Sequence, residues 1–262
     1  MRFAHHMLSW HDWARAQGRP LDVDEMLDGV RAAGYDGVEL MGDEMEALGP
    51  TASLKGKLAA AGLEAVAVAT LVTARPDDAN TVGYRRQLDW AAELGVEVNM
   101  VCGGWLGEAT QRRTALDEDY AAFAANLERA GADARERGMR TGFHPHTGCI
   151  VETSAEVERL LAHVPGLDLT VDTGHLAAVR SDPAALIDTH PGKVVHVHLK
   201  DYDSRTRFFT EPGRGDVGLD FAEVLAALRR AGYTGWAVAE LDRPALPPRE
   251  SATLTRDYLR SL

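Results

Sequence analysis

The feature that most constrains the fold is a short unit that recurs along the chain. In each copy a helix-like stretch ends at a glycine, and a strand-like run follows within a few residues. Copies occur at 31–40, 59–69, 92–101, 134–143 and 229–240. A glycine just past a helix adopts the left-handed conformation that ends the helix and turns the chain. Two more strand-like runs follow Pro-Gly pairs at 164–172 and 190–199, and an eighth lies at 2–8.

Eight strands that alternate with helical stretches predict a parallel sheet with right-handed crossovers. The chain has 262 residues, a length that α/β barrels reach with a single core. No G-x-G-x-x-G follows an early strand, which disfavours an open dinucleotide-binding sheet. We therefore predict a single (β/α)₈ TIM barrel domain over residues 1–262.

Charge and cysteine content exclude several classes of protein. The formal net charge is -12, whereas nucleic-acid binding needs a dense basic face. The two cysteines, Cys102 and Cys149, make no disulfide framework, so a cytoplasmic protein is expected. The first residues contain no signal-peptide pattern, and no run of about 18 apolar residues predicts a membrane span. A homo-oligomer is compatible with the sequence, which does not specify one.

The candidate site lies at the carboxyl ends of the strands, where barrel enzymes build their active sites. Side chains two apart on a strand share a face, so the apolar residues of each strand identify the opposite, inward face. The inward candidates are Glu39, His144, His146, Asp168, Thr170, Asp172, His196, His198, Lys200 and Glu240.

A metal ion explains why several strands bring ionisable residues to one rim. A single inward histidine is more often a hydrogen-bonded core residue, and a single carboxylate often caps the next helix. Here four successive strands carry such residues, and burying their ionisable side chains without partners would be very costly. A divalent cation neutralises the carboxylates and orders the imidazoles. Mixed carboxylate and imidazole ligands leave Mn²⁺, Co²⁺, Fe²⁺, Zn²⁺ and Mg²⁺ open, and no cysteine pattern indicates structural zinc.

Three motifs carry a family resemblance: VDTGH at 171–175, HVHLKD at 196–201 and AELD at 239–242. Together they resemble the sugar isomerase/epimerase-like superfamily of metal-dependent TIM barrels. The resemblance implies Asp172, His198 and Glu240 as metal ligands and His175 as a contact to substrate oxygens. We expect Mn²⁺ or Co²⁺ as the cation, with the other divalent metals as alternatives.

The segment 141–148 departs from the epimerases of that superfamily. It offers His144 and His146 where those enzymes have a glutamate that serves as ligand and base. This feature and the stretch 211–244 resemble the myo-inosose (2-keto-myo-inositol) dehydratase branch. We take His146 as the expected fourth ligand, with His144 as the open alternative. The resemblance implies a lyase acting on a keto-cyclitol or keto-sugar through an enediolate, and the alternative is a ketose isomerase or epimerase.

The candidate residues divide into expected catalytic residues and expected contacts to substrate. Glu240, His144, His146, His175 and Lys200 are the expected catalytic residues, as bases, acids or donors to substrate oxygens. Contacts to substrate are expected from Glu39, His196, Trp10, Trp105 and Arg214, although core packing or plain solvation explains several of these equally well.

Two other readings belong to different classes of protein. Endonuclease IV shares the fold and some motifs, but the charge of -12 and the absence of a further Asp-x-His after segment 193–201 disfavour DNA repair. A non-catalytic, metal-binding subunit of a hetero-oligomeric sugar enzyme is the further alternative, although such a subunit has no need to keep an intact ligand set.

Overall fold

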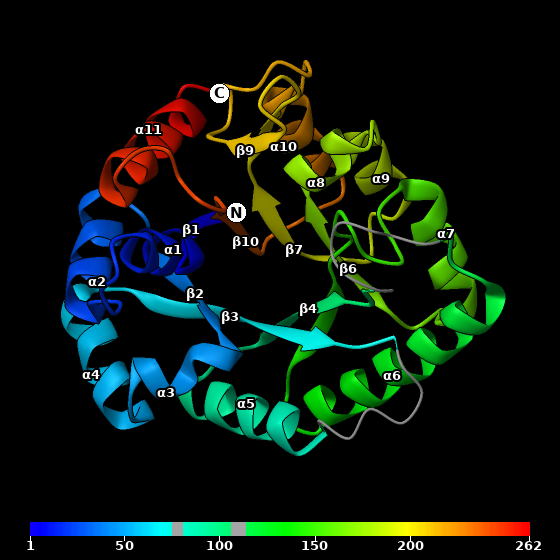
Figure 1. The fold of residues 1–262 in the computed structure, drawn as a ribbon, viewed down its shortest axis with the longest axis horizontal. Helices are drawn as coiled ribbons and strands as arrows, with labels where there is room; N and C mark the ends of the chain where they lie inside the picture. Colours follow the sequence, from blue (N-terminus) through cyan, green and yellow to red (C-terminus); the bar gives the residue numbers. More distant parts are fainter. Residues whose placement is uncertain (75–80, 106–113) are drawn as a thin grey trace.

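The computed structural model describes residues 1–74, 81–105 and 114–262, and its centre is a closed barrel of eight parallel strands (Figure 1). The strand order around the barrel is β1-β10-β7-β6-β5-β4-β3-β2. The predicted (β/α)₈ fold is therefore confirmed. The barrel strands are β1 (Arg2–His6), β2 (Gly37–Met41), β3 (Glu64–Val72), β4 (Val98–Gly103), β5 (Arg140–Phe143), β6 (Asp168–Asp172), β7 (Val194–Leu199) and β10 (Trp236–Ala239).

Helices surround the barrel and connect its strands (Figure 1). Those on the first half are α1 (Leu8–Ala16), α2 (Val23–Ala32), the 3₁₀ turn η1 (Gly42–Glu44), α3 (Met45–Leu48), α4 (Thr51–Ala61), α5 (Thr81–Leu94) and α6 (Asp117–Arg135). The second half carries α7 (Ser154–His163), α8 (Thr173–Ala178), α9 (Pro183–Thr189), α10 (Phe221–Arg230) and α11 (Pro248–Arg260). Within the described ranges, no helix has the length and apolar character needed to cross a membrane.

The apolar faces of the strands pack against the helices, as the alternation predicted. Phe143, Leu169, Val171 and Val197 belong to one buried cluster with residues of α6, α7, α9 and α10. The rings of Phe143 and Phe123 meet edge to face with centroids 5.6 Å apart. The opposite, inward face is thereby left to the polar residues.

A small hairpin follows β7 that the sequence pattern did not predict. Strands β8 (Asp201–Asp203) and β9 (Phe208–Thr210) pair antiparallel, outside the barrel order. The hairpin brings the Phe209 ring 4.5 Å from the ring of His175 and 4.7 Å from Lys200 Nζ. It therefore supplies an apolar wall beside the residues at the end of β7.

The glycines of the repeated unit end their helices as expected. All five have a positive φ, between 66° and 84°, at Gly34, Gly62, Gly95, Gly138 and Gly232. Side chains other than hydrogen are strained in this region by about 1–2 kcal/mol. The repeat is therefore a backbone requirement of the helix-to-strand turns.

Gly138→Ala isolates this requirement, because no atom lies within 4 Å of a Cβ built at Gly138 and its φ is +78°. We expect a loss of about 1–2 kcal/mol in the free energy of unfolding, from backbone strain alone. Gly166→Ala is the matched control, since Gly166 has equal space but no positive φ. There the alanine should be neutral or add about 0.4–1 kcal/mol. Denaturant unfolding of both variants measures this, and equal effects would contradict it.

Candidate metal centre and active site

Four strand ends deliver metal-ligand side chains to one point. His144 directly follows β5, Asp172 ends β6, His198 lies in β7, and Glu240 directly follows β10. One donor atom from each lies within 4.8 Å of those of the other three. All four residues are buried, and Glu240 is the most exposed of them at 8%. We call these four residues the strand-end cluster.

The strand-end cluster is held together by short polar contacts. His144 Nε2 lies 3.1 Å from Asp172 Oδ2. His198 Nδ1 lies 3.0 Å from Glu240 Oε2 and 3.6 Å from Asp172 Oδ2. The other oxygen of Asp172 accepts the His175 backbone N–H at 2.8 Å and so caps α8. This cap fixes the carboxylate that the cluster shares.

Lys200 brings a buried positive charge to the same carboxylates. Its Nζ lies 2.6 Å from Glu240 Oε2 and 3.1 Å from both Asp172 Oδ2 and Asp242 Oδ2. Burial alone would lower the pKa of Lys200, but these carboxylates raise it well above the usual value. Burial would likewise raise the pKa of Asp172, yet Lys200 and the neighbouring histidines hold it well below the usual range. Lys200 and Asp172 are therefore both charged at neutral pH.

Glu39 of β2 contacts His198 on the side away from the other members of the strand-end cluster. Its Oε2 lies 2.8 Å from both His196 Nε2 and His198 Nε2, and its Oε1 lies 3.9 Å from His6 Nε2. The carboxylate accepts the Nε2–H of His198, so Nδ1 is the nitrogen that faces the cluster. A metal-binding histidine typically has its second nitrogen held in this way.

The arrangement fits a divalent cation. His198 Nδ1 is buried and has no hydrogen-bond partner of acceptable geometry, although Glu240 Oε2 lies 3.0 Å away. The nitrogen is thus directed between the carboxylates of the cluster. Three carboxylates, of Asp172, Glu240 and Asp242, contact the single ammonium of Lys200, and a cation reduces this excess of negative charge. Carboxylate oxygens and imidazole nitrogens suit the divalent metals from Mg²⁺ to Zn²⁺.

His146, the expected fourth ligand, lies outside the strand-end cluster. The backbone N–H of His144 bonds to the Val101 carbonyl of β4 at 2.8 Å, which keeps His144 in register with the strand ends. His146 lies beyond, in the loop, where its Nδ1 bonds to the Thr147 carbonyl at 2.7 Å. One donor atom of His146 lies within 4.8 Å of the sulfurs of Cys102 and Cys149. The geometry therefore favours His144 as the ligand.

His175 lies between His146 and the hairpin. Its ring centroid is 3.8 Å from that of His146. The Nδ1 atom faces the backbone N–H of Thr147 at 3.3 Å and its hydroxyl at 3.0 Å, so Nδ1 is the acceptor. Burial and the charge of Lys200 hold the pKa of His175 well below the usual value. The ring is thus neutral, and its Nε2–H is a buried donor without a partner.

Three candidates lie away from the strand-end cluster. The Trp10 ring packs in the core against Gly29, where an added Cβ would lie 2.0 Å from Trp10 Cη2. Arg214 is mostly exposed and lies 3.8 Å from a carboxylate oxygen of Glu211. Asp168 begins β6 at the opposite end of the strand and pairs with Arg140.

Trp105 does lie near the candidate site. It forms an isolated bridge with Cys149, and its ring meets that of His146 edge to face with centroids 5.8 Å apart. The residues that follow it, 106–113, are outside the described part of the chain.

Sequence reasoning missed four residues close to the site: His6, Cys102, Phe209 and Asp242. His6 follows the same strand alternation as the other inward residues and ends β1, so the pattern was sufficient to find it. Asp242 lies two residues after Glu240 in the motif AELD. No sequence pattern indicated Phe209 or Cys102, because their positions depend on the hairpin and on pairing between β4 and β5.

Comparisons with known proteins agree with this architecture. Residues 27–262 match the family described as xylose isomerase-like TIM barrel, and the chain belongs to this family. The chain is 26% identical to an inosose dehydratase of Lacticaseibacillus casei, with 92% of this chain and 90% of the relative covered. The predicted family resemblance is thus confirmed.

Solved structures share the fold at lower sequence identity. The probable 3-DHS dehydratase from Bacillus anthracis superposes with a TM-score of 0.81 at 14% identity, covering 99% of both chains. The 3-keto-D-glucoside 4-epimerase from E. coli gives a TM-score of 0.78 at 19% identity and covers 100% of both chains. Dehydratases and epimerases thus share this barrel, and the fold alone does not separate them.

Glu39→Gln tests the support beneath His198. The amide keeps the shape of the carboxylate but removes its charge, so we expect Mn²⁺ to bind about 10–100-fold more weakly. Calorimetric titration with Mn²⁺ measures this, with circular dichroism to verify folding. Glu64→Gln is the control, because Glu64 makes only an exposed pair with Arg2. Unchanged Mn²⁺ affinity in Glu39→Gln would show that Glu39 does not position His198.

Metal affinity should rise with pH. Burial opposes a charged His198, but Glu39 and Glu240 outweigh it and raise its pKa well above the usual value. Below that pKa the cation must displace a proton from Nδ1, so binding releases about one proton and weakens as pH falls. Mn²⁺ titrations between pH 6 and 8, in buffers of different ionisation enthalpy, count the protons. A pH-independent affinity with no proton release would contradict the assignment of His198 as a ligand.

Proposed function

We propose that this protein is a divalent-metal-dependent dehydratase, a carbon–oxygen lyase, that acts on a keto-cyclitol of the inosose class. The observation that carries the proposal is the strand-end cluster, in a chain that matches an inosose dehydratase over 92% of its length. Mn²⁺ or Co²⁺ is the proposed cation. The proposed compartment is the cytoplasm, in keeping with two buried free thiols.

His144, Asp172, His198 and Glu240 are the proposed metal ligands. When bound, the cation would act as a Lewis acid on the substrate ketone and make its α-hydrogen more acidic. Glu39, which also bonds to His196, holds Nε2 of His198, and the backbone N–H of His175 in α8 holds Asp172. The ligands are thus fixed by the barrel before any substrate arrives.

Substrate oxygens meet two donors in this site. The neutral His175 has its Nε2–H available, because Thr147 occupies Nδ1. The ammonium of Lys200 lies between three carboxylates and against the Phe209 ring, so its position is fixed. A fixed ammonium in a buried site stabilises negative charge that develops on a nearby substrate oxygen.

His146 and Glu240 are the proposed proton carriers. The Nδ1–H of His146 is engaged by the Thr147 carbonyl, so its Nε2 carries the lone pair and can accept a proton. Its ring lies against that of His175, the proposed substrate donor. Glu240 is the most exposed member of the strand-end cluster, and Lys200 and His198 hold its pKa well below the usual range against the effect of burial. Glu240, as the carboxylate, removes the α-proton, and His146, protonated at Nε2 beforehand, gives that proton to the departing β-hydroxyl, which leaves as water.

An epimerase is the alternative, and one observation disfavours it. The resemblance implies that ketose epimerases use two carboxylates, at the ends of the fifth and eighth barrel strands. In this chain the fifth position is His144, and the only carboxylate of that pair is Glu240. The pair of carboxylate bases that the resemblance implies for an epimerase is therefore incomplete in this chain.

Product analysis separates the two reactions. The protein with Mn²⁺ is incubated in D₂O with 2-keto-myo-inositol, a 3-keto-glucoside or a ketohexose, the metal is removed by chelation, and the mixture is read by proton NMR. We expect loss of water from 2-keto-myo-inositol, with a new vinylic or diketone product. Deuterium at the α-carbon with an epimeric product would instead identify an epimerase.

The same assay tests the two histidines of the β5 segment. We expect His146→Ala to lower kcat by about 10²-fold or more with unchanged Mn²⁺ content, as for a general acid or base. His144→Ala should lose metal as well as activity. His163→Ala, on the exposed end of α7, is the control. Normal turnover in both His144→Ala and His146→Ala would refute the proposed roles of this segment.

A further inference from the structure

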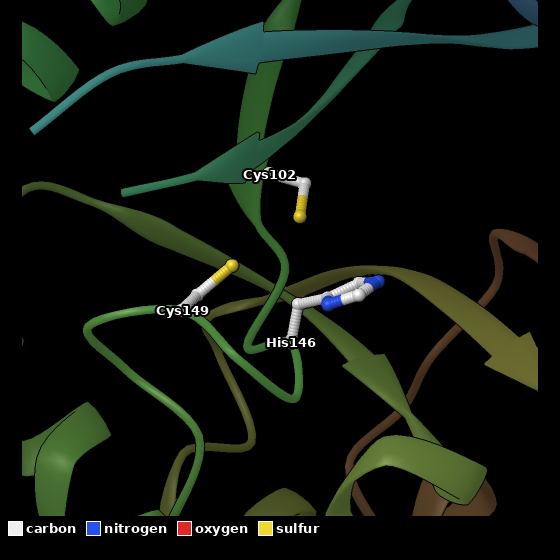
Figure 2. A group of neighbouring side chains, drawn as sticks. All are labelled: Cys102, His146 and Cys149. Atoms are coloured by element: carbon white, nitrogen blue, oxygen red, sulfur yellow. The ribbon is translucent and has the colours of Figure 1, made fainter. Parts of the chain in front are cut away.

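Two cysteines and a histidine meet beside the strand-end cluster. Cys102 lies in β4, while His146 and Cys149 lie in the loop between β5 and α7. One donor atom from each lies within 4.8 Å of the other two. Figure 2 shows the sulfurs of Cys102 and Cys149 pointing into the same space, with the imidazole of His146 beside it. We call these three residues the thiol cluster.

The backbone of the loop is shaped to bring two of these residues together. The N–H of Cys149 bonds to the carbonyl of His146 at 3.1 Å, which closes a four-residue turn. Gly148, the third residue of that turn, has a φ of +87°, as a type II turn requires. His146 and Cys149 thus flank a tight turn with a His-x-x-Cys spacing, and their side chains lie on the same side.

The loop is also tied to β4, which supplies the third residue. The N–H of Ile150 bonds to the Gly104 carbonyl at 3.0 Å, and Cys149 bridges Trp105. These bonds hold the loop that carries Cys149 beside the end of β4, where Cys102 lies. Backbone contacts therefore help to place the residues of the thiol cluster.

The chemistry of the three donors points to a different cation from that of the strand-end cluster. Both thiols are buried and free, in a small apolar cluster with Met100. Thiolate ligands select thiophilic metals, whereas the strand-end cluster offers oxygen and nitrogen only. Two thiolates and a neutral imidazole form an electrically neutral group with a divalent cation, and a neutral group is what a buried site tolerates.

We propose that Cys102, His146 and Cys149 form a second metal site that binds one thiophilic divalent cation of the zinc type, separate from the strand-end cluster. The site does not require the proposed dehydratase function, but a cation bound through Nε2 of His146 would occupy the atom that the proposed proton transfer uses. Its three protein donors leave a fourth coordination position open to water or another small ligand.

The contribution of His146 to the site depends on which of its ring nitrogens binds the cation. Its Nδ1–H donates to the Thr147 carbonyl at 2.7 Å. Figure 2 shows one ring nitrogen on the side of the cysteines and the other directed away from them. Ligation through Nδ1 moves the ring proton to Nε2 and gives up the bond to Thr147, while ligation through Nε2 preserves that bond. Loss of the cysteines must therefore affect binding more than loss of the imidazole does.

Cobalt titration of the full chain tests the proposal. The reduced protein, pre-loaded with Mn²⁺ and kept anaerobic with a phosphine reductant, is titrated with Co²⁺ while the near-ultraviolet spectrum is recorded. Only thiolate ligation produces a sulfur-to-cobalt charge-transfer band. We expect a saturable band that is lost in Cys102→Ala and Cys149→Ala, and that shifts to higher cobalt concentration in His146→Ala.

Asp172→Ala is the matched control, because it removes a ligand of the strand-end cluster and leaves the thiol cluster intact. The band should persist there unchanged. A second measurement needs no variant: bound Zn²⁺ should protect both cysteines of the wild-type chain from alkylation. Absence of the band with both thiols reduced, its persistence in a Cys102→Ala/Cys149→Ala double variant, or its loss in Asp172→Ala would each overturn the proposal.

Discussion

The contact of Lys200 with Asp172, Glu240 and Asp242 is the interaction on which the rest of the site depends. These groups lie at the mouth of the barrel, where most of their surface is removed from water, and charges there are tolerated only when compensated. One ammonium does not balance the carboxylates around it. The remaining negative charge is what makes the strand-end cluster suitable for a cation.

The need to compensate buried charge also explains the polar residues deeper in the barrel. Glu39 is fully buried and is surrounded by the imidazoles of His6, His196 and His198. Those histidines are themselves buried, so each requires a partner. The result is a stack of alternating acidic and basic groups that runs from the barrel interior to its mouth. Such a stack orients the imidazole of His198 without any contribution from the loops.

Much of this was predictable from sequence, because it depends on backbone periodicity. Glycines that end helices located the strands, and alternation within 168–172 and 194–199 gave the inward faces, including Asp172 and His198. Two features depended on tertiary structure and were not predictable. His144 and His146 share a strand face by alternation, but β5 ends at Phe143 and the turn at Gly148 redirects His146. Trp10 lies in a helix that packs its ring into the core.

The pairing of β1 with β10 has a consequence for how the protein is made. Ala4 pairs with Val238, so β1 gains β10 as its second neighbour only after the residues up to Val238 have been synthesised. Until then the growing sheet has two open edges, and such edges are where chains associate wrongly. Glu240 lies just beyond the strand that closes the barrel. Closure of the barrel and completion of the strand-end cluster are therefore the same late event in biosynthesis.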